Sequence, residues 1–136
     1  MLPAVPKLLL VGVGTAEAAA EFADKLGVDP SMCFADENGV MGDALGLEKG
    51  FKTMWNPPAV DTMMARNDQD SLKALGEAYS DAAKSIGFQR LAPKKIGDTL
   101  RQGGTFVFKG EKLLLEHYDS VVGGNCEIEE ILTAIR

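Results

Sequence analysis

The side chains best suited to chemistry are few and lie far apart in this sequence. The chain has two cysteines, Cys33 and Cys126, and one histidine, His117, which is followed by Asp119 and Ser120. A thiol can act as a redox group, and a histidine beside an acid can activate a hydrolytic nucleophile. Residues two apart on a strand share a face, so the side chains of His117 and Asp119 can touch. Because no glycine elbow surrounds a nucleophile, we interpret His117 as a surface histidine and predict no catalytic residue.

The two cysteines have two interpretations. No CxxC joins them, and Cys and His alone cannot complete a four-ligand zinc set, so no metal-binding residue is predicted. Lone cysteines are most often buried small apolar side chains, which suits Cys33 in its apolar context. Cys126 is expected in the first turn of the last helix, where the helix dipole favours a thiolate, although three nearby glutamates oppose it. A redox role for Cys33 and Cys126 is the weaker alternative.

A glycine loop near the start of the chain raises the question of a nucleotide site. The run Leu8–Val11 is followed by Gly12 and Gly14 and then by an alanine-rich stretch, which is the order strand, loop, helix. A dinucleotide fingerprint needs Gly or Ala at a third position, where this chain has Glu17. That carboxylate would face the bound pyrophosphate, so we predict no nucleotide cofactor. Glu17 is better explained as a first-turn acid that interacts favourably with the helix dipole.

Composition limits the class of protein. The 136 residues suit one domain, and the net charge of −6 with a pI near 4.8 argues against a nucleic-acid partner. No apolar run approaches the roughly 20 residues of a membrane span, so no transmembrane segment is expected.

The hydrophobic pattern predicts an α/β fold. Strands are expected at 7–13, 31–36, 105–108 and 112–115, with helices closed by Gly27, Gly46 and Gly87, a short strand at 88–91, and a final helix capped by Asn125. The predicted fold class is a small mixed sheet, with parallel βα units and a C-terminal antiparallel hairpin, flanked by helices. The short helix before Gly46 is expected to turn Met41, Ala44 and Leu45 inward. The final helix is expected to bury the stripe Ile128, Ile131, Leu132 and Ile135.

Residues 50–70 break the pattern, because Gly50, Pro57 and Pro58 forbid a long regular element. One interpretation is a long loop or broken helix on the core. The other is a docking segment for a protein partner, since Met and aromatic residues are enriched at interfaces. The candidate contact residues of that docking segment are Phe51, Met54, Trp55, Met63 and Met64.

Several blocks resemble a known family. The blocks "KLLLVGVGTAEAAAEFADKLG", "CFADENGVMGDALGL", "GFKTMWNPPAV" and "QGGTFVFKGEKLLLEHYDSVVGGNCEIEEIL" resemble the peroxiredoxin-like 2 (AhpC/TSA-like) family of the thioredoxin-like superfamily. The last block is the most specific, and residues 65–100 match least. The run of blocks is most similar to the plastid-targeted branch.

The resemblance implies a thioredoxin-like sheet and a thiol-redox ancestry, with a CxxC at the start of a helix upstream of the GVGT strand. Residues 1–6 contain no cysteine, so no catalytic residue is carried over. We therefore expect one truncated domain over 1–136 that lacks the CxxC-bearing unit. Without the central strand of that unit, the sheet would have a gap. Three alternatives are open: a longer protein contains the strand, a partner supplies one, or strand 7–13 pairs directly with the hairpin.

Three functions follow from this resemblance. The first is a non-catalytic accessory subunit of a larger protein assembly, with a plastid photosynthetic membrane complex as a candidate host. The second is a thiol oxidoreductase or antioxidant enzyme whose CxxC half lies upstream of this sequence. The third is a redox sensor that uses Cys33 and Cys126.

Overall fold

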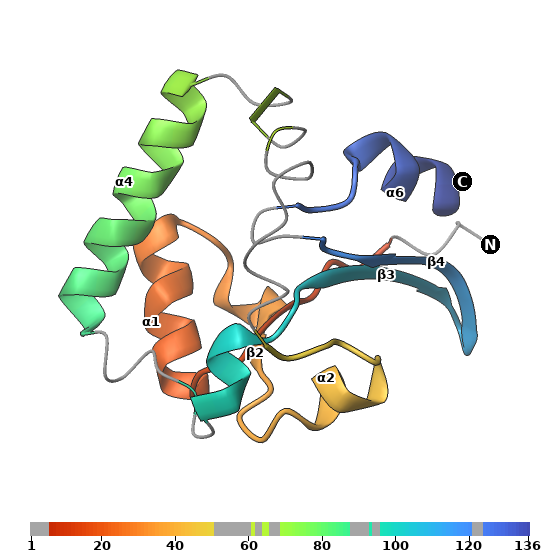
Figure 1. The fold of residues 1–136 in the computed structure, drawn as a ribbon, viewed down its shortest axis with the longest axis horizontal. Helices are drawn as coiled ribbons and strands as arrows, with labels where there is room; N and C mark the ends of the chain where they lie inside the picture. Colours follow the sequence, from red (N-terminus) through yellow and green to blue (C-terminus); the bar gives the residue numbers. More distant parts are fainter. Residues whose placement is uncertain are drawn as a thin grey trace. The chain divides into compact units, whose positions relative to one another are not determined.

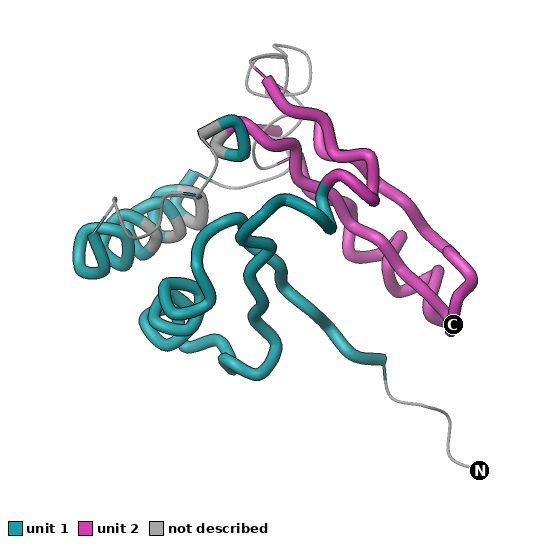
Figure 2. Tube along the Cα trace, turned by 90° about the horizontal axis from the view of Figure 1, so that it is seen from below, with its two compact units in different colours: residues 1–42, 68–99 teal, residues 43–67, 100–136 magenta. Residues whose placement is uncertain are grey.

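The protein was analysed as a computed structural model, which describes residues 6–50, 61, 64–65, 69–87, 93, 96–120 and 124–136 (Figure 1). The chain forms two compact units, residues 1–42 with 68–99 and residues 43–67 with 100–136, coloured separately in Figure 2.

The first unit begins with the strand–loop–helix that the sequence predicts, although its strand is short. Strand β1 spans Leu10–Gly12 and pairs in parallel with β2, Cys33–Ala35. Helix α1, Ala16–Leu26, lies between them in the chain and is coloured orange in Figure 1. The Thr15 side chain accepts a hydrogen bond from Ala18 N and caps α1, and Gly27 ends the helix with φ 69°. Both predicted helix boundaries are confirmed.

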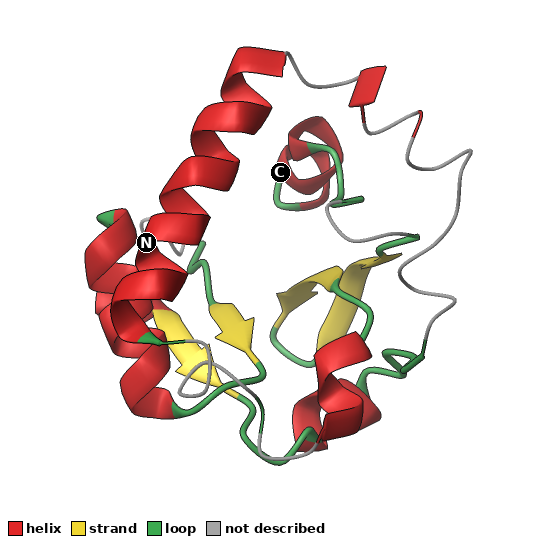
Figure 3. Cartoon of the chain, turned by 60° about the vertical axis from the view of Figure 1, so that its left-hand side comes forward, coloured by secondary structure: helices red, strands yellow, loops and turns green. Residues whose placement is uncertain are grey.

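The core of the first unit lies between two helices. Helix α4, Gln69–Ile86, packs against α1, as Figure 3 also shows. The buried apolar side chains are Ala18 and Ala23 of α1 and Ala82 and Ile86 of α4. Three of these four residues are alanines, whose small side chains allow the backbones of the two helices to approach closely at these positions. Gly87 follows α4 with φ 95°, at the predicted end of the helix. The strand expected at 88–91 lies outside the described residues.

Helix α2, Val40–Ala44, does not bury the face that the sequence predicts. Met41 is 44% exposed, Ala44 is also exposed, and the buried position is Gly42. Gly42 N donates a hydrogen bond of 2.8 Å to Asp36 Oδ2, which satisfies a backbone donor of the first turn. A helix of five residues is too short for an apolar stripe to determine its orientation, and this hydrogen bond acts at its first turn instead.

The second unit contains the predicted hairpin. Strands β3, Gly104–Lys109, and β4, Lys112–Tyr118, pair antiparallel, with a register shift between Val107 and Phe108. Gly110, in the two-residue turn, has φ 62°, which explains the glycine there. The rings of Phe106 and Tyr118 meet edge to face with centroids 5.4 Å apart. Within the described residues the strands form two separate pairs, β1–β2 and β3–β4.

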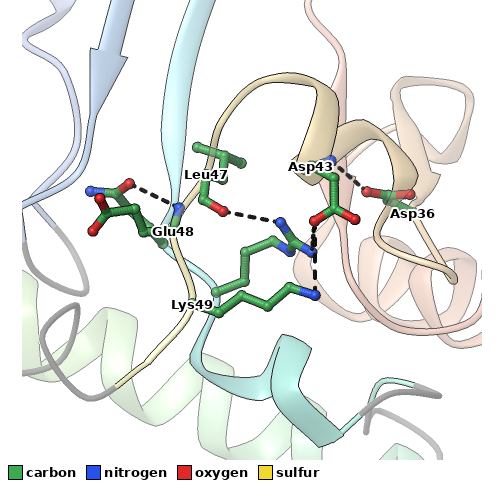
Figure 4. A network of polar contacts seen from close by, with 8 residues as sticks. Asp36, Asp43, Leu47, Glu48 and Lys49 are labelled. Atoms are coloured by element: carbon green, nitrogen blue, oxygen red, sulfur yellow. Dashed lines mark hydrogen bonds and ion pairs between the residues drawn. The ribbon is translucent and has the colours of Figure 1, made fainter.

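A buried arginine connects the segment after α2 to the hairpin. The Arg101 side chain is 3% exposed and donates hydrogen bonds to Leu47 O at 3.1 Å and to Asp43 Oδ1 at 2.8 Å. Lys49 Nζ lies 3.8 Å from the same Asp43 oxygen. Figure 4 shows the Lys49 side chain reaching the Asp43 carboxylate, with Leu47 close by. The contacts of Arg101 fix the start of the hairpin, because β3 begins three residues after Arg101.

The last helix differs from its prediction in two ways. Helix α6 spans Ile128–Ala134 and has Glu127, not Asn125, at its N-cap position. Its predicted inner stripe is largely exposed, since Ile128, Leu132 and Ile135 are all at least 39% accessible and only Ile131 is partly covered. With seven residues, α6 packs on β4 over a short contact that does not cover the stripe.

The chain is thus a mixed α/β protein with a small parallel sheet and an antiparallel hairpin flanked by helices, as predicted. Among the described residues, no helix combines the length and apolar character needed to cross a membrane.

Candidate functional site

The loop between β4 and α6 brings together residues that are separate in the sequence. One ring nitrogen of His117, Sγ of Cys126 and a carboxylate oxygen of Glu130 lie within 4.8 Å of one another. His117 comes from the end of β4, Cys126 from the segment before α6, and Glu130 from the first turn of α6. The packing of α6 on β4 therefore assembles this group, which we call the His117 cluster.

The ring of His117 is oriented by a backbone carbonyl. Its Nε2 lies 2.9 Å from Gly124 O, and because a carbonyl oxygen only accepts, Nε2 carries the proton in this contact. The lone pair of the neutral ring is therefore on Nδ1. The ring is 31% exposed, so the predicted surface histidine is in fact half-buried between the strand and the loop.

A buried carboxylate stands behind the histidine. Asp119 Oδ1 lies 3.5 Å from His117 Nε2, so the predicted contact between these two side chains is confirmed. Asp119 is 9% exposed, and its Oδ1 accepts no hydrogen bond from the part of the chain that the structure describes. Burial raises the pKa of Asp119 above its ordinary value of 3.8, and the positive charge that His117 can carry opposes this shift.

The backbone around Asp119 is held on both sides. Its N–H donates to Gly103 O at 3.0 Å, and its carbonyl accepts a hydrogen bond of 2.8 Å from Gln102 Nε2. The residues before β3 thus fix the carboxylate at the end of β4. This support explains how a carboxylate stays buried beside the imidazole.

Cys126 is the buried thiol of the cluster. It is 6% exposed, and its Sγ donates a hydrogen bond of 3.1 Å to Glu130 Oε2. Cys126 precedes the N-cap residue Glu127, so the prediction that it lies in the first turn of the last helix is wrong. The helix-dipole argument for a thiolate no longer applies, and the nearest charged partner is an acid.

The other sequence-predicted residues lie elsewhere. Cys33 is on β2 in the first unit, half-buried, with its Sγ 3.8 Å from Asp29 O, and neither cysteine forms a disulfide. Of the predicted docking residues, Met64 is described and is 39% exposed. Phe51, Met54, Trp55 and Met63 lie outside the described residues.

Sequence reasoning missed Glu130 as a member of the cluster. The metal prediction counted only Cys and His, and a carboxylate oxygen is an equally accepted zinc ligand. A signal was present, because Cys126 and Glu130 have the i, i+4 spacing that makes neighbours on a helix. The approach of His117 depends on how the loop returns α6 to β4, which no local pattern encodes.

Comparison with known proteins then gives the class. The family model described as AhpC/TSA antioxidant enzyme matches residues 3–121, which is most of the chain. The chain therefore belongs to this family and has a thioredoxin-like, peroxiredoxin-like ancestry. No curated protein matched the chain, and no solved structure matched it.

Proposed function

We propose that the chain is a non-catalytic, peroxiredoxin-like accessory subunit that docks in a larger protein assembly. One observation carries the proposal, namely the exposed apolar surface around β1. This surface, which we call the β1 patch, is 41–61% exposed at every member and consists of Leu8, Leu9, Leu10, Val11 and Phe34.

Both faces of the parallel pair contribute to the β1 patch. Val11 is opposite Phe34 in the register, so these side chains share a face, which Leu9 joins two residues earlier. Leu8 and Leu10 point to the opposite face. Parallel strands are normally covered on both faces, and two strands alone are marginally stable in water. The β1 patch is therefore a surface that needs a cover.

The occupant we propose is an extended segment of a partner protein that pairs with the outer edge of β1. Among the described residues β1 pairs with β2 and with no other strand, so its other edge offers unpaired backbone groups. An added strand would use these groups and cover both apolar faces. The net charge of −6 favours a partner with a basic surface over an anionic lipid surface.

Four further parts of the proposal rest on the resemblance and on the sequence pattern. These are a plastid location, a photosynthetic membrane complex as host, a single peroxiredoxin-like domain over 1–136, and a second contact region at 50–70. The host and the location are supported by similarity to the plastid-targeted branch, and the contact region by its Met and aromatic residues.

The test is the size of the native complex. A tagged chain is expressed in its own cells, and mild extracts are separated by native electrophoresis. We expect the chain to migrate well above the position of its 14.5 kDa monomer. Leu9→Lys should return it to the monomer position, because a lysine in the β1 patch cannot be covered without burying a charge.

The matched control is Val40→Lys, which makes the same change at an apolar residue of α2 that is 69% exposed and lies outside the β1 patch. It should leave the complex intact. Migration of the wild type as a folded monomer would contradict the proposal. So would a Leu9→Lys variant that unfolds in isolation while Val40→Lys does not, because β1 would then be covered by the chain's own hairpin.

The second candidate function is a thiol-dependent antioxidant enzyme, which the family match favours. In this case the CxxC half is encoded upstream of Lys7. The 5′ end of the transcript tests it. An open frame that encodes CxxC, in a longer protein whose peroxide reduction is lost when those cysteines become serine, would establish the enzyme. An in-frame stop directly upstream would exclude it.

A further inference from the structure

We propose that the His117 cluster is a zinc site, with His117, Cys126 and Glu130 as ligands and a fourth position open to water or to a small anion. This inference is independent of the docking proposal. Two of the three ligands, Cys126 and Glu130, follow the segment that the family model matches, so the site is a feature of this chain that the family match does not cover.

The ligand types select the metal. A thiolate, an imidazole nitrogen and a carboxylate oxygen are the three protein ligands that zinc uses, whereas magnesium and calcium prefer oxygen alone. Three protein ligands with one open position is the arrangement of zinc sites that bind an exchangeable fourth group. Cobalt(II) occupies such sites with the same geometry and serves as the spectroscopic substitute.

The distances are close to those of a bound site. Ligand atoms around a tetrahedral zinc ion lie roughly 3.2–3.8 Å apart, which follows from bond lengths of about 2.0–2.3 Å. Cys126 Sγ and Glu130 Oε2 are already 3.1 Å apart, and all three ligand atoms lie within 4.8 Å. The longer separations involve the His117 nitrogen, so rotamer movements of about 1 Å that bring the imidazole, the thiol and the carboxylate together close the site.

Binding exchanges one proton for the metal. In the structure the Cys126 thiol keeps its proton and donates a hydrogen bond to Glu130 Oε2. When zinc binds, the S–H bond breaks, the proton leaves to solvent, and the sulfur and the carboxylate oxygen each bind the ion. No change of oxidation state occurs.

The surroundings of His117 match those of a metal-binding histidine. Such a histidine donates its other ring N–H to a carbonyl or a carboxylate, which fixes the tautomer. Here Nε2 contacts Gly124 O at 2.9 Å and Asp119 Oδ1 at 3.5 Å, and a neutral ring that donates from Nε2 carries its lone pair on Nδ1. The buried Asp119 oxygen, which accepts no hydrogen bond within the described residues, then has a role: it faces the Nε2–H of His117 and positions the ring.

An entry path is present. Glu130 is exposed and lines a shallow groove between β4 and α6, together with Leu114, Leu115, Glu129, Thr133 and Ala134. Glu130 is therefore the ligand of the cluster that an ion from solvent meets first, whereas the Cys126 thiol is buried.

The experiment uses the whole reduced chain, purified free of metal and titrated with Co²⁺ in an absorption spectrometer. We expect one equivalent to bind, with a thiolate-to-cobalt band in the near ultraviolet and the visible bands of a tetrahedral ion. Zinc should displace it. Cys126→Ser should abolish the thiolate band, and Glu130→Gln should weaken binding at least tenfold.

Matched controls separate the site from its neighbours. Cys33→Ser removes the other thiol, and Glu129→Gln neutralises the adjacent acid of α6, so both should bind as the wild type does. Asp119→Asn should weaken Co²⁺ binding about 10–100-fold while the thiolate band keeps its position, because this residue acts through His117.

Three results would overturn the site: a wild-type chain without a cobalt–thiolate band, a band that persists in Cys126→Ser, or a band lost equally in Cys33→Ser. Glu130→Gln keeps the test decisive if Cys126→Ser fails to fold, because Glu130 is exposed and its amide preserves the helix.

Discussion

Gly103 is the residue whose missing side chain leaves room for Asp119. A Cβ built at Gly103 would fall on Asp119 Oδ2 and lie 3.3 Å from its Cγ. The carboxylate cannot retreat easily, because it is buried and its own backbone is bonded to Gly103. Gly103→Ala should therefore push Asp119 away from His117 and lower the free energy of unfolding by about 1–3 kcal/mol.

Chemical denaturation measures this effect, and Gly76→Ala is the control. Gly76 lies in α4, where an added Cβ would meet nothing within 4 Å. Alanine is a better helix former than glycine, so this variant should gain roughly 0.5–1 kcal/mol. If Gly103→Ala were as stable as the wild type, the position of the Asp119 carboxylate would not be constrained in this way.

At the scale of elements, two side chains cap the first turn of α1. Thr15 Oγ1 accepts a hydrogen bond of 3.2 Å from Ala18 N, and Glu37 Oε1 accepts one of 3.0 Å from Ala16 N. Thr15→Ala should lower the free energy of unfolding by about 1 kcal/mol, whereas Thr15→Ser should keep most of it because the hydroxyl is retained. Circular dichroism during urea denaturation distinguishes the two variants, and equal losses would show that the hydroxyl is not the cause.

The elements that the sequence predicted well share a local signal. Thr15 and Gly27 bound α1 in the sequence and in the structure, and Gly110 marks the hairpin turn in both. In each case one residue type meets a backbone requirement that does not depend on the rest of the fold: a cap acceptor, or a positive φ.

The elements predicted poorly depend on tertiary contacts. The stripe of α6 has helical spacing, yet Ile128 is 67% exposed because a seven-residue helix packs on β4 over a short contact. His117 and Cys126 meet for the same reason, through the docking of α6 rather than through spacing. A periodic pattern tells which residues share a face, but it does not tell what covers that face.

At the scale of the whole molecule, the two units each have their own core. Ala18, Ala23, Ala82 and Ile86 are buried apolar residues of the first unit, and Cys126 is one of the second. Because folded proteins are only marginally stable, anything that binds the folded form alone should stabilise it measurably. The β1 patch and the His117 cluster belong to different units. A partner that covers the β1 patch and a metal ion bound at the His117 cluster should therefore stabilise different parts of the chain.

This separation leads to a prediction for the chain with and without Zn²⁺. At a zinc concentration of 100 times the dissociation constant, binding stabilises the folded form by about 2.7 kcal/mol. If the two units open separately, zinc should slow the hydrogen exchange of β4 and α6, residues 112–118 and 128–134, because the zinc ligands connect these two elements. Exchange in α1 and α4 of the other unit, residues 16–26 and 69–86, should stay unchanged. Hydrogen–deuterium exchange followed by mass spectrometry measures both regions in one experiment. Cys126→Ser, which lacks the sulfur ligand, should show no slowing at any position.

Equal protection of all four segments would show that the units open as one cooperative body, and protection confined to 16–26 and 69–86 would place the metal outside the His117 cluster.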